Sequence, residues 1–166
     1  MPNITLTWTA SLYSPRAEQY GDNDWIFSLK WRRTDNDTLI TRNAGLYIIQ
    51  DSDGDVVYAG KADNFRNRFE DRADAVQELG LSRDDAVLGH RVKIATVNPG
   101  LQLSLAEQWL IRILYIRDQA NMEHLLQNIN LTGQFQAPAD GLTITNNNNR
   151  PNYLNANYNY AGGANI

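Results

Sequence analysis

The chain has 166 residues, a hydrophobic fraction of 42% and a formal net charge of −4, which fits one globular domain with room for extensions. It contains no cysteine, and this excludes disulfides, thiolate zinc sites and cysteine nucleophiles. No apolar run approaches the roughly 20 residues that cross a bilayer, and the amino terminus, MPNITLTWTA, lacks the pattern of a signal peptide. We therefore expect a soluble, cytoplasmic protein. The negative charge argues against tight nonspecific binding to nucleic acid, because phosphate contacts reward a positive surface.

Composition divides the chain into three parts. Residues 1–42 form a polar N-terminal extension, in which WIFSLKW at 25–31 alternates enough to predict a strand. Residues 43–131 hold the strongest periodic patterns and are the predicted domain. Residues 132–166 are rich in asparagine and nearly free of charge, which is typical of a low-complexity tail that either wraps loosely around the domain or is a flexible end. Three tyrosines could dock this tail onto the domain: Tyr153, Tyr158 and Tyr160.

Three strands and two helices are predicted in the central part. In chain order they are strand 45–50, strand 56–60, helix 63–79, strand 89–97 and helix 103–118. The turn between the first two strands, DSDGD, contains Asp53-Gly54, a strong hairpin signal. Asp63 is the expected N-cap of the first helix. The second helix is apolar around most of its circumference, so we expect it to be central and largely buried.

The predicted hairpin brings two tyrosines together. A two-residue turn places Tyr58 opposite Ile49 and Gly60 opposite Tyr47, whereas a turn centred one residue earlier pairs the two tyrosines directly. In either register both phenol side chains point to the same face, because side chains alternate along a strand and paired residues share a face. Aromatic packing is the simpler explanation of such a pair, since aromatic residues are favoured in strands.

Glu107 lies in the middle of the second helix without a basic neighbour one turn away. A carboxylate on a mostly buried helix needs a partner or a metal ion. The alternative is that Glu107 lies on a narrow solvent stripe with Ser104. Arg68 follows the Gly60-Lys61 loop by one helical turn, where its guanidinium could pair with Asp71 or bind a phosphate oxygen.

Together these residues resemble the GIY-YIG nuclease family. GLY at 45–47, then ten residues, then YAG at 58–60 resembles the pair of motifs that names the family. The stretch YAGKADNFRNRF at 58–69 is similar to the equivalent stretch of the bacterial excision-repair nuclease and of intron-encoded homing endonucleases, with Arg68 ten residues after the second tyrosine. Glu107, which opens EQWLI, matches the helical metal ligand of the family. The resemblance covers 45–131, with leucine and alanine where the family has isoleucine.

The resemblance implies an α+β fold with a small three-stranded antiparallel sheet flanked by helices, here with an N-terminal strand extension and an asparagine-rich C-terminal tail. It also implies a metal-dependent endonuclease that hydrolyses phosphodiester bonds in nucleic acid, more often DNA than RNA. Glu107 would hold one Mg²⁺ or Mn²⁺. The main alternative is a catalytically inactive module of this family that binds nucleic acid or a protein partner.

Roles for individual residues follow from the same resemblance. Tyr47 would activate or position the attacking water, with Lys61 lowering its pKa or binding phosphate. Tyr58 would position water or phosphate, and Arg68 would stabilise the developing negative charge. The terminal asparagine of the family is assigned to Asn128, with Asn130 and Asn121 as alternatives. The residues expected to contact nucleic acid are Lys61, Arg66, Arg68 and Arg72.

Two other classes of protein are excluded by spacing. DSDGD suggests a calcium loop, but an EF-hand that starts at Asp51 needs glycine and glutamate where this chain has Val56 and Ala62. A serine hydrolase of the nucleophile-elbow type is excluded because no G-x-S-x-G occurs in the sequence.

Overall fold

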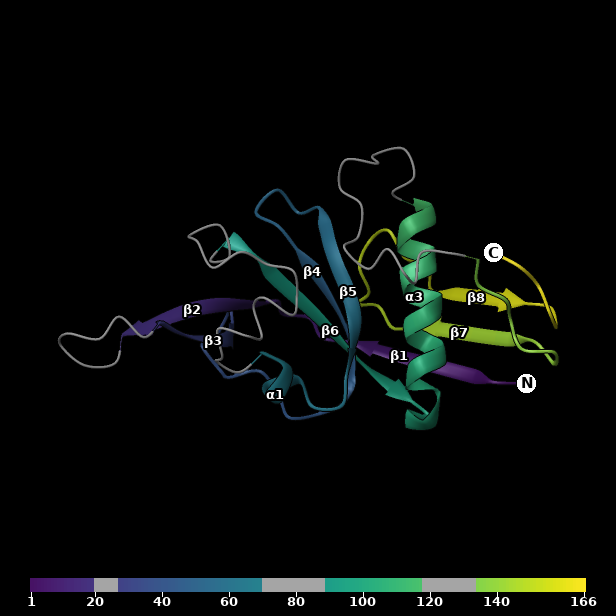
Figure 1. Ribbon diagram of the computed structural model, residues 1–166, viewed down its shortest axis with the longest axis horizontal. Helices are drawn as coiled ribbons and strands as arrows, with labels where there is room; N and C mark the ends of the chain where they lie inside the picture. The colour runs from purple at the N-terminus through teal and green to yellow at the C-terminus, as the bar shows by residue number, and fades with distance from the viewer. Residues whose placement is uncertain (20–26, 70–88, 118–133) are drawn as a thin grey trace.

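The fold is a single mixed β-sheet with helices packed against it (Figure 1). In this computed structural model the described residues are 1–19, 27–69, 89–117 and 134–166. The first five strands are β1 (Asn3–Trp8), β2 (Tyr13–Gln19), β3 (Phe27–Arg33), β4 (Gly45–Gln50) and β5 (Val56–Ala62). The remaining elements are α1 (Phe65–Phe69), β6 (Arg91–Asn98), a 3₁₀ turn (Gly100–Gln102), α3 (Leu103–Arg117), β7 (Leu142–Asn146) and β8 (Asn157–Tyr160).

In the described residues the sheet has eight strands, and β6 lies at its centre. One path through the sheet runs β3-β2-β6-β1-β7-β8, while β4 pairs with the other edge of β6 and β5 pairs with β4. All neighbours are antiparallel except β1 and β7, which are parallel. The expectation of a small three-stranded sheet flanked by helices is therefore wrong. Strands β5, β4 and β6 do form an antiparallel trio, but it is one part of a much larger sheet.

The C-terminal region supplies two of the additional strands. LTITN has the period-two alternation of a half-buried strand, and Leu142 and Ile144 of β7 are buried. The asparagine run is used for pairing: Asn146 Oδ1 accepts a 2.8 Å hydrogen bond from Trp8 Nε1, and the Asn147 side chain bonds both the N–H and the C=O of Trp8. The described part of the tail thus forms one end of the sheet, and it has a regular strand pattern in spite of its asparagine-rich composition.

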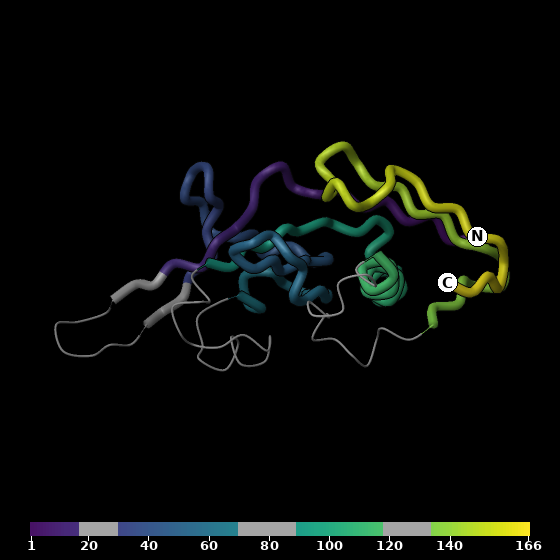
Figure 2. Tube along the Cα trace, turned by 90° about the horizontal axis from the view of Figure 1, so that it is seen from above, coloured from purple at the N-terminus to yellow at the C-terminus, as the bar shows by residue number. Residues whose placement is uncertain are grey.

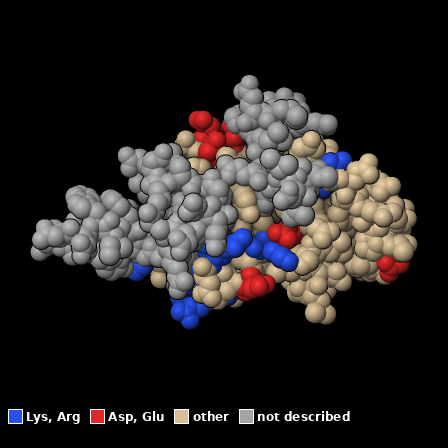
Figure 3. All heavy atoms as spheres, in the orientation of Figure 1, with Lys and Arg blue, Asp and Glu red and all other residues tan. Residues whose placement is uncertain are grey.

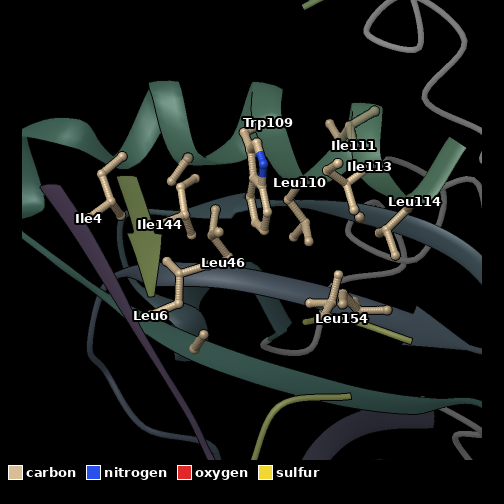
Figure 4. Close-up of a cluster of buried hydrophobic side chains, with 14 of the residues drawn as sticks. Ile4, Leu6, Leu46, Trp109, Leu110, Ile111, Ile113, Leu114, Ile144 and Leu154 are labelled. Atoms are coloured by element: carbon tan, nitrogen blue, oxygen red, sulfur yellow. The ribbon is translucent and has the colours of Figure 1, made fainter. Parts of the chain in front are cut away.

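The buried side chains of the described residues form two hydrophobic cores on opposite faces of the β4–β5–β6 trio. The larger core lies under α3 and joins it to β1, β4 and β7, and Figure 4 shows Trp109 pointing from α3 toward the sheet. The smaller core lies under α1 and contains Tyr47, Ile49, Phe65 and Phe69. Figure 2, which views α3 nearly end-on, shows this helix lying beside the curved end of the sheet, where β1 runs alongside the C-terminal strands.

The helix predicted at 103–118 is confirmed by α3, and its buried residues face two sides because the sheet curves around it. Within the described residues, no helix has both the length and the apolar character that a membrane span requires. Of the helix predicted at 63–79, the structure describes the part up to residue 69, which contains α1; residues 70–79 lie outside the described residues. Its N-cap is Asn64 rather than Asp63, because Asn64 Oδ1 accepts the backbone N–H of Asn67 at 3.1 Å.

Candidate active site at the free edge of β5

The β4–β5 hairpin places the two motif tyrosines on one face of the sheet. Tyr47 is opposite Gly60 and Tyr58 is opposite Ile49, which confirms the register predicted for a turn at Asp53-Gly54. A β-bulge follows Ile49, so the turn itself is longer than two residues. The rings of the two tyrosines are stacked, with centroids 6.0 Å apart and an interplanar angle of 11°.

Gly60 is required by the close packing of the Tyr47 phenol against β5. A Cβ at position 60 would lie 2.7 Å from the hydroxyl oxygen of Tyr47 and 2.9 Å from Cζ of its ring. Phe69 of α1 packs edge-on against the same ring, with the two centroids 5.0 Å apart. Glycine at the end of the YAG motif therefore has a packing reason: it makes room for the tyrosine of the first motif.

Arg68 contacts Tyr47 directly. Its Nε donates a 3.3 Å hydrogen bond to the phenol oxygen, and α1 holds the arginine there because Phe65 and Phe69 on the same helix are buried. Burial raises the pKa of the fully buried Tyr47 well above its ordinary value, while the hydrogen bond and positive charge of Arg68 oppose this shift. The negative charge of Glu107 makes the smallest of the contributions that raise this pKa.

Glu107 reaches the edge of β5 from the opposite face of the sheet. Its Oε1 accepts a 3.2 Å hydrogen bond from the backbone N–H of Lys61. The Lys61 ammonium lies 3.9 Å from Oε2 of the same carboxylate and donates a 2.6 Å hydrogen bond to Ser104 Oγ. Glu107 has 17% of its side chain exposed and Lys61 has 39%, so this group lies at the protein surface.

The two halves of the site meet because β5 is an edge strand in the described sheet. It pairs only with β4 there, so residues of the α1 face and of the α3 face both reach its open side. Figure 3 shows Lys and Arg side chains beside Asp and Glu side chains in the region between α1 and α3. Three consecutive elements, β4, β5 and α1, and the more distant α3 thus contribute Tyr47, Tyr58, Arg68 and Glu107 to this edge.

Not every predicted site residue belongs to this group. Lys61 does not contact Tyr47; its ammonium is bound to Ser104 and lies near Glu107, so the positive charge acting on the phenol is that of Arg68. Arg66 donates from Nε to the carbonyl oxygen of Ile40 at 3.1 Å. Arg72 lies outside the described residues, as do the three candidates for the family asparagine, Asn121, Asn128 and Asn130.

Ser104 is the residue of this site that sequence reasoning left unassigned. It precedes Glu107 by three residues, so the two lie on one side of α3, as the solvent-stripe interpretation expected. The signal was present in the helix periodicity. The contact of Ser104 with Lys61 could not be predicted from the sequence, because Lys61 comes from a strand 43 residues away.

A divalent cation at this site would have Glu107 as its protein ligand. The described residues contain no group of three or more His, Asp or Glu side chains that could hold a metal ion. A single carboxylate with one oxygen outside the backbone hydrogen bond fits Mg²⁺, which usually keeps several waters and binds through one or two carboxylates together with phosphate oxygens.

Comparison of the chain with protein-family models, with curated protein sequences and with solved structures gives no match.

Proposed function

We propose that this protein is a metal-dependent endonuclease that hydrolyses phosphodiester bonds in nucleic acid, with DNA as the favoured substrate, and that it acts in the cytoplasm. The observation that carries the proposal is the hydrogen bond between Arg68 and Tyr47 beside the stacked Tyr58, with the Glu107 carboxylate at the same edge of β5. The arrangement places a permanent cation and a carboxylate at a partly exposed edge of the sheet, beside two phenols of which Tyr47 is buried and Tyr58 half-buried.

Arg68 supplies positive charge to the phosphate. A guanidinium stays protonated at any physiological pH, and its planar shape suits a phosphate oxygen. The hydrogen bond from Nε to Tyr47 fixes the orientation of this plane. The group is thus held in place before the reaction begins, so it can stabilise the negative charge that develops on the phosphoryl oxygens without reorganising.

Tyr47 acts as a hydrogen-bond donor in this proposal. Because burial raises its pKa, the phenol keeps its proton at neutral pH. Its oxygen accepts from Arg68, and no acceptor for its own hydrogen occurs among the described residues. The hydroxyl can therefore orient a water molecule or a phosphate oxygen that reaches it, and Tyr58, which is half-buried and stacked on Tyr47, lies between this phenol and the surface.

Glu107 would hold the divalent cation through the carboxylate oxygen that is not bonded to the backbone of Lys61. When bound, Mg²⁺ or Mn²⁺ supplies charge stabilisation at the scissile phosphate. The backbone hydrogen bond from Lys61 fixes the orientation of the carboxylate relative to β5, which also carries Tyr58.

The test is cleavage by the purified full chain. Supercoiled plasmid, linear duplex DNA and RNA are incubated with Mg²⁺, with Mn²⁺ and with EDTA, and Arg68→Ala is assayed in parallel. We expect nicking or cleavage of DNA that requires the cation and is strongly reduced in the variant. Binding of nucleic acid without cleavage under every condition would instead establish a binding module.

A further inference from the structure

One residue, Lys61, contacts both oxygens of the Glu107 carboxylate. Its backbone N–H donates to Oε1 at 3.2 Å, and its ammonium lies 3.9 Å from Oε2. The backbone contact is part of the β5 edge and does not depend on the side chain. The ammonium contact does depend on the side chain. It places a positive charge beside Oε2, the oxygen that remains available to bind a cation.

Ser104 holds the ammonium in this position. The hydrogen bond from Lys61 Nζ to Ser104 Oγ is 2.6 Å long, shorter than the distance to the carboxylate. Because Ser104 lies one turn before Glu107 on α3, the hydroxyl and the carboxylate face the lysine together. In the part of the chain that the structure describes, Lys61 is the one basic side chain in ion-pair contact with Glu107.

The position of this charge bears on cation binding. A carboxylate that already faces an ammonium is partly neutralised, and a divalent cation on the same oxygen would be repelled by a positive charge a few ångströms away. The lysine side chain is flexible and 39% exposed, so it can leave Ser104 and extend toward solvent. The two positive charges therefore compete for one carboxylate.

We propose that Lys61 is a charge placeholder: its ammonium, anchored on Ser104, neutralises Glu107 in the cation-free protein and is displaced when a divalent cation binds. This inference rests on the proposed function, since it assumes that Glu107 is the cation ligand. The Lys61 ammonium then lowers the affinity of the free protein for divalent cations, because the cation must displace it. It also means that cation binding releases an ammonium at the rim of the site, where phosphate groups of a nucleic acid would be attracted to it.

The experiment measures Mn²⁺ binding by the full-length protein in the absence of nucleic acid, using the electron paramagnetic resonance signal of free Mn²⁺. Lys61→Met removes the charge but keeps the backbone hydrogen bond to Glu107. We expect it to bind Mn²⁺ roughly tenfold more tightly than the wild-type chain. Lys61→Arg, which keeps a positive charge, is the matched control and should resemble the wild type.

Ser104→Ala provides a second and independent variant. It leaves every charge in place and removes only the anchor of the ammonium, so Mn²⁺ affinity should rise by a smaller factor than in Lys61→Met. Circular dichroism establishes that each variant is folded. Because Ser104 is exposed, its replacement tests the inference even where a Lys61 variant loses stability.

The outcomes separate the inference from the function on which it rests. Mn²⁺ affinity that is equal or weaker in both Lys61→Met and Ser104→Ala, with measurable binding in the wild type that Glu107→Gln abolishes, overturns the placeholder role alone. The absence of Mn²⁺ binding in all of these proteins overturns the cation site and the inference together.

Discussion

The two oxygens of the Glu107 carboxylate have different neighbours, and this determines what a substitution there should do. Oε1 is bonded to a backbone N–H, while Oε2 faces the Lys61 ammonium. The lysine is 39% exposed, so water can solvate it when the carboxylate is removed. A stabilising role through a buried ion pair, the alternative to a catalytic one, therefore has little support in this geometry.

Glu107→Gln should thus abolish cleavage and leave folding almost unchanged. The glutamine amide oxygen can still accept from Lys61, but the charge that holds the cation is lost. We expect activity to fall by orders of magnitude, because metal and electrostatic contributions are typically worth several kcal/mol. Thermal melts and cleavage assays are performed on this variant and on Asp37→Asn, which removes one exposed negative charge elsewhere. A sharply lowered melting temperature with unchanged activity per folded molecule would refute the assignment.

Tyr153 is a second residue whose neighbours determine what a substitution should do, and no catalytic role is expected for it. Burial raises the pKa of this phenol to about 12, opposed by a 3.4 Å hydrogen bond from Gln50 Nε2. The phenol of the unfolded chain ionises near pH 10. The unfolded state therefore loses its proton first, and the tyrosine's contribution to stability is complete below about pH 10 and is lost as the pH rises toward about 12.

We expect Tyr153→Phe to reduce the loss of stability at high pH. The free energy of unfolding, measured with urea between about pH 8 and about pH 11, should fall with pH in both proteins but less steeply in the variant. The variant has no phenol proton to release at this position. Parallel slopes for the two proteins would show that Tyr153 titrates alike in the folded and unfolded chains.

Among the secondary-structure elements, α3 is the one whose position matters most for the site, and the C-terminal strands determine that position. Trp109 is fully buried, donates a 3.0 Å hydrogen bond to the Tyr160 hydroxyl and packs edge-on against Tyr158, with centroids 5.0 Å apart. Since Glu107 is two residues before Trp109, these contacts with β8 fix the helix that carries the proposed cation ligand.

Tyr160→Phe should destabilise the protein while leaving the site intact. The substitution keeps the ring and removes the acceptor of the buried Trp109 indole, which costs about 1–3 kcal/mol when the donor is left unsatisfied. Urea unfolding measures the loss. Cleavage per folded molecule should stay at the wild-type value, because Trp109 and Glu107 face different sides of the helix. A variant as stable as the wild type would mean that water or another group satisfies the indole.

At the scale of the whole molecule, one sheet connects the expected extension, domain and tail. β1 from the extension pairs with β6 of the central part and with β7 of the tail. The larger core accordingly combines Leu6, Leu46 and Ile144 from all three parts. None of the four proposed site residues comes from the tail, yet the tail completes the surface on which α3 packs.

Truncation after Ala139 should therefore prevent cooperative folding. The deletion removes β7 and β8 together with the buried side chains of Leu142, Ile144 and Leu154, and each buried leucine or isoleucine contributes about 2–5 kcal/mol. Thermal denaturation followed by circular dichroism is the measurement, with the full chain as control. A cooperative transition near the wild-type temperature would contradict it.

The local geometry of the site could be predicted from the amino-acid sequence. Alternation of side chains and the turn signal at Asp53-Gly54 predicted the hairpin and the common face of Tyr47 and Tyr58, and the structure has the first of the two registers that the turn allowed. The apolar periodicity of 103–118 predicted α3 with Glu107 in its middle. These features depend on residues close together in the chain, where backbone geometry allows few alternatives.

The size of the sheet and the partners of the charged groups could not be predicted in this way, because both depend on contacts between segments far apart in the chain. The pairing of β1 with β7 joins segments more than 130 residues apart, as the 138-residue separation of Trp8 and Asn146 shows, and no local pattern specifies it. The contact of Lys61 with Ser104 and Glu107 likewise depends on how α3 lies across β5. A strand pattern reveals which face is buried, but the strand it pairs with is selected by the packing of the whole core.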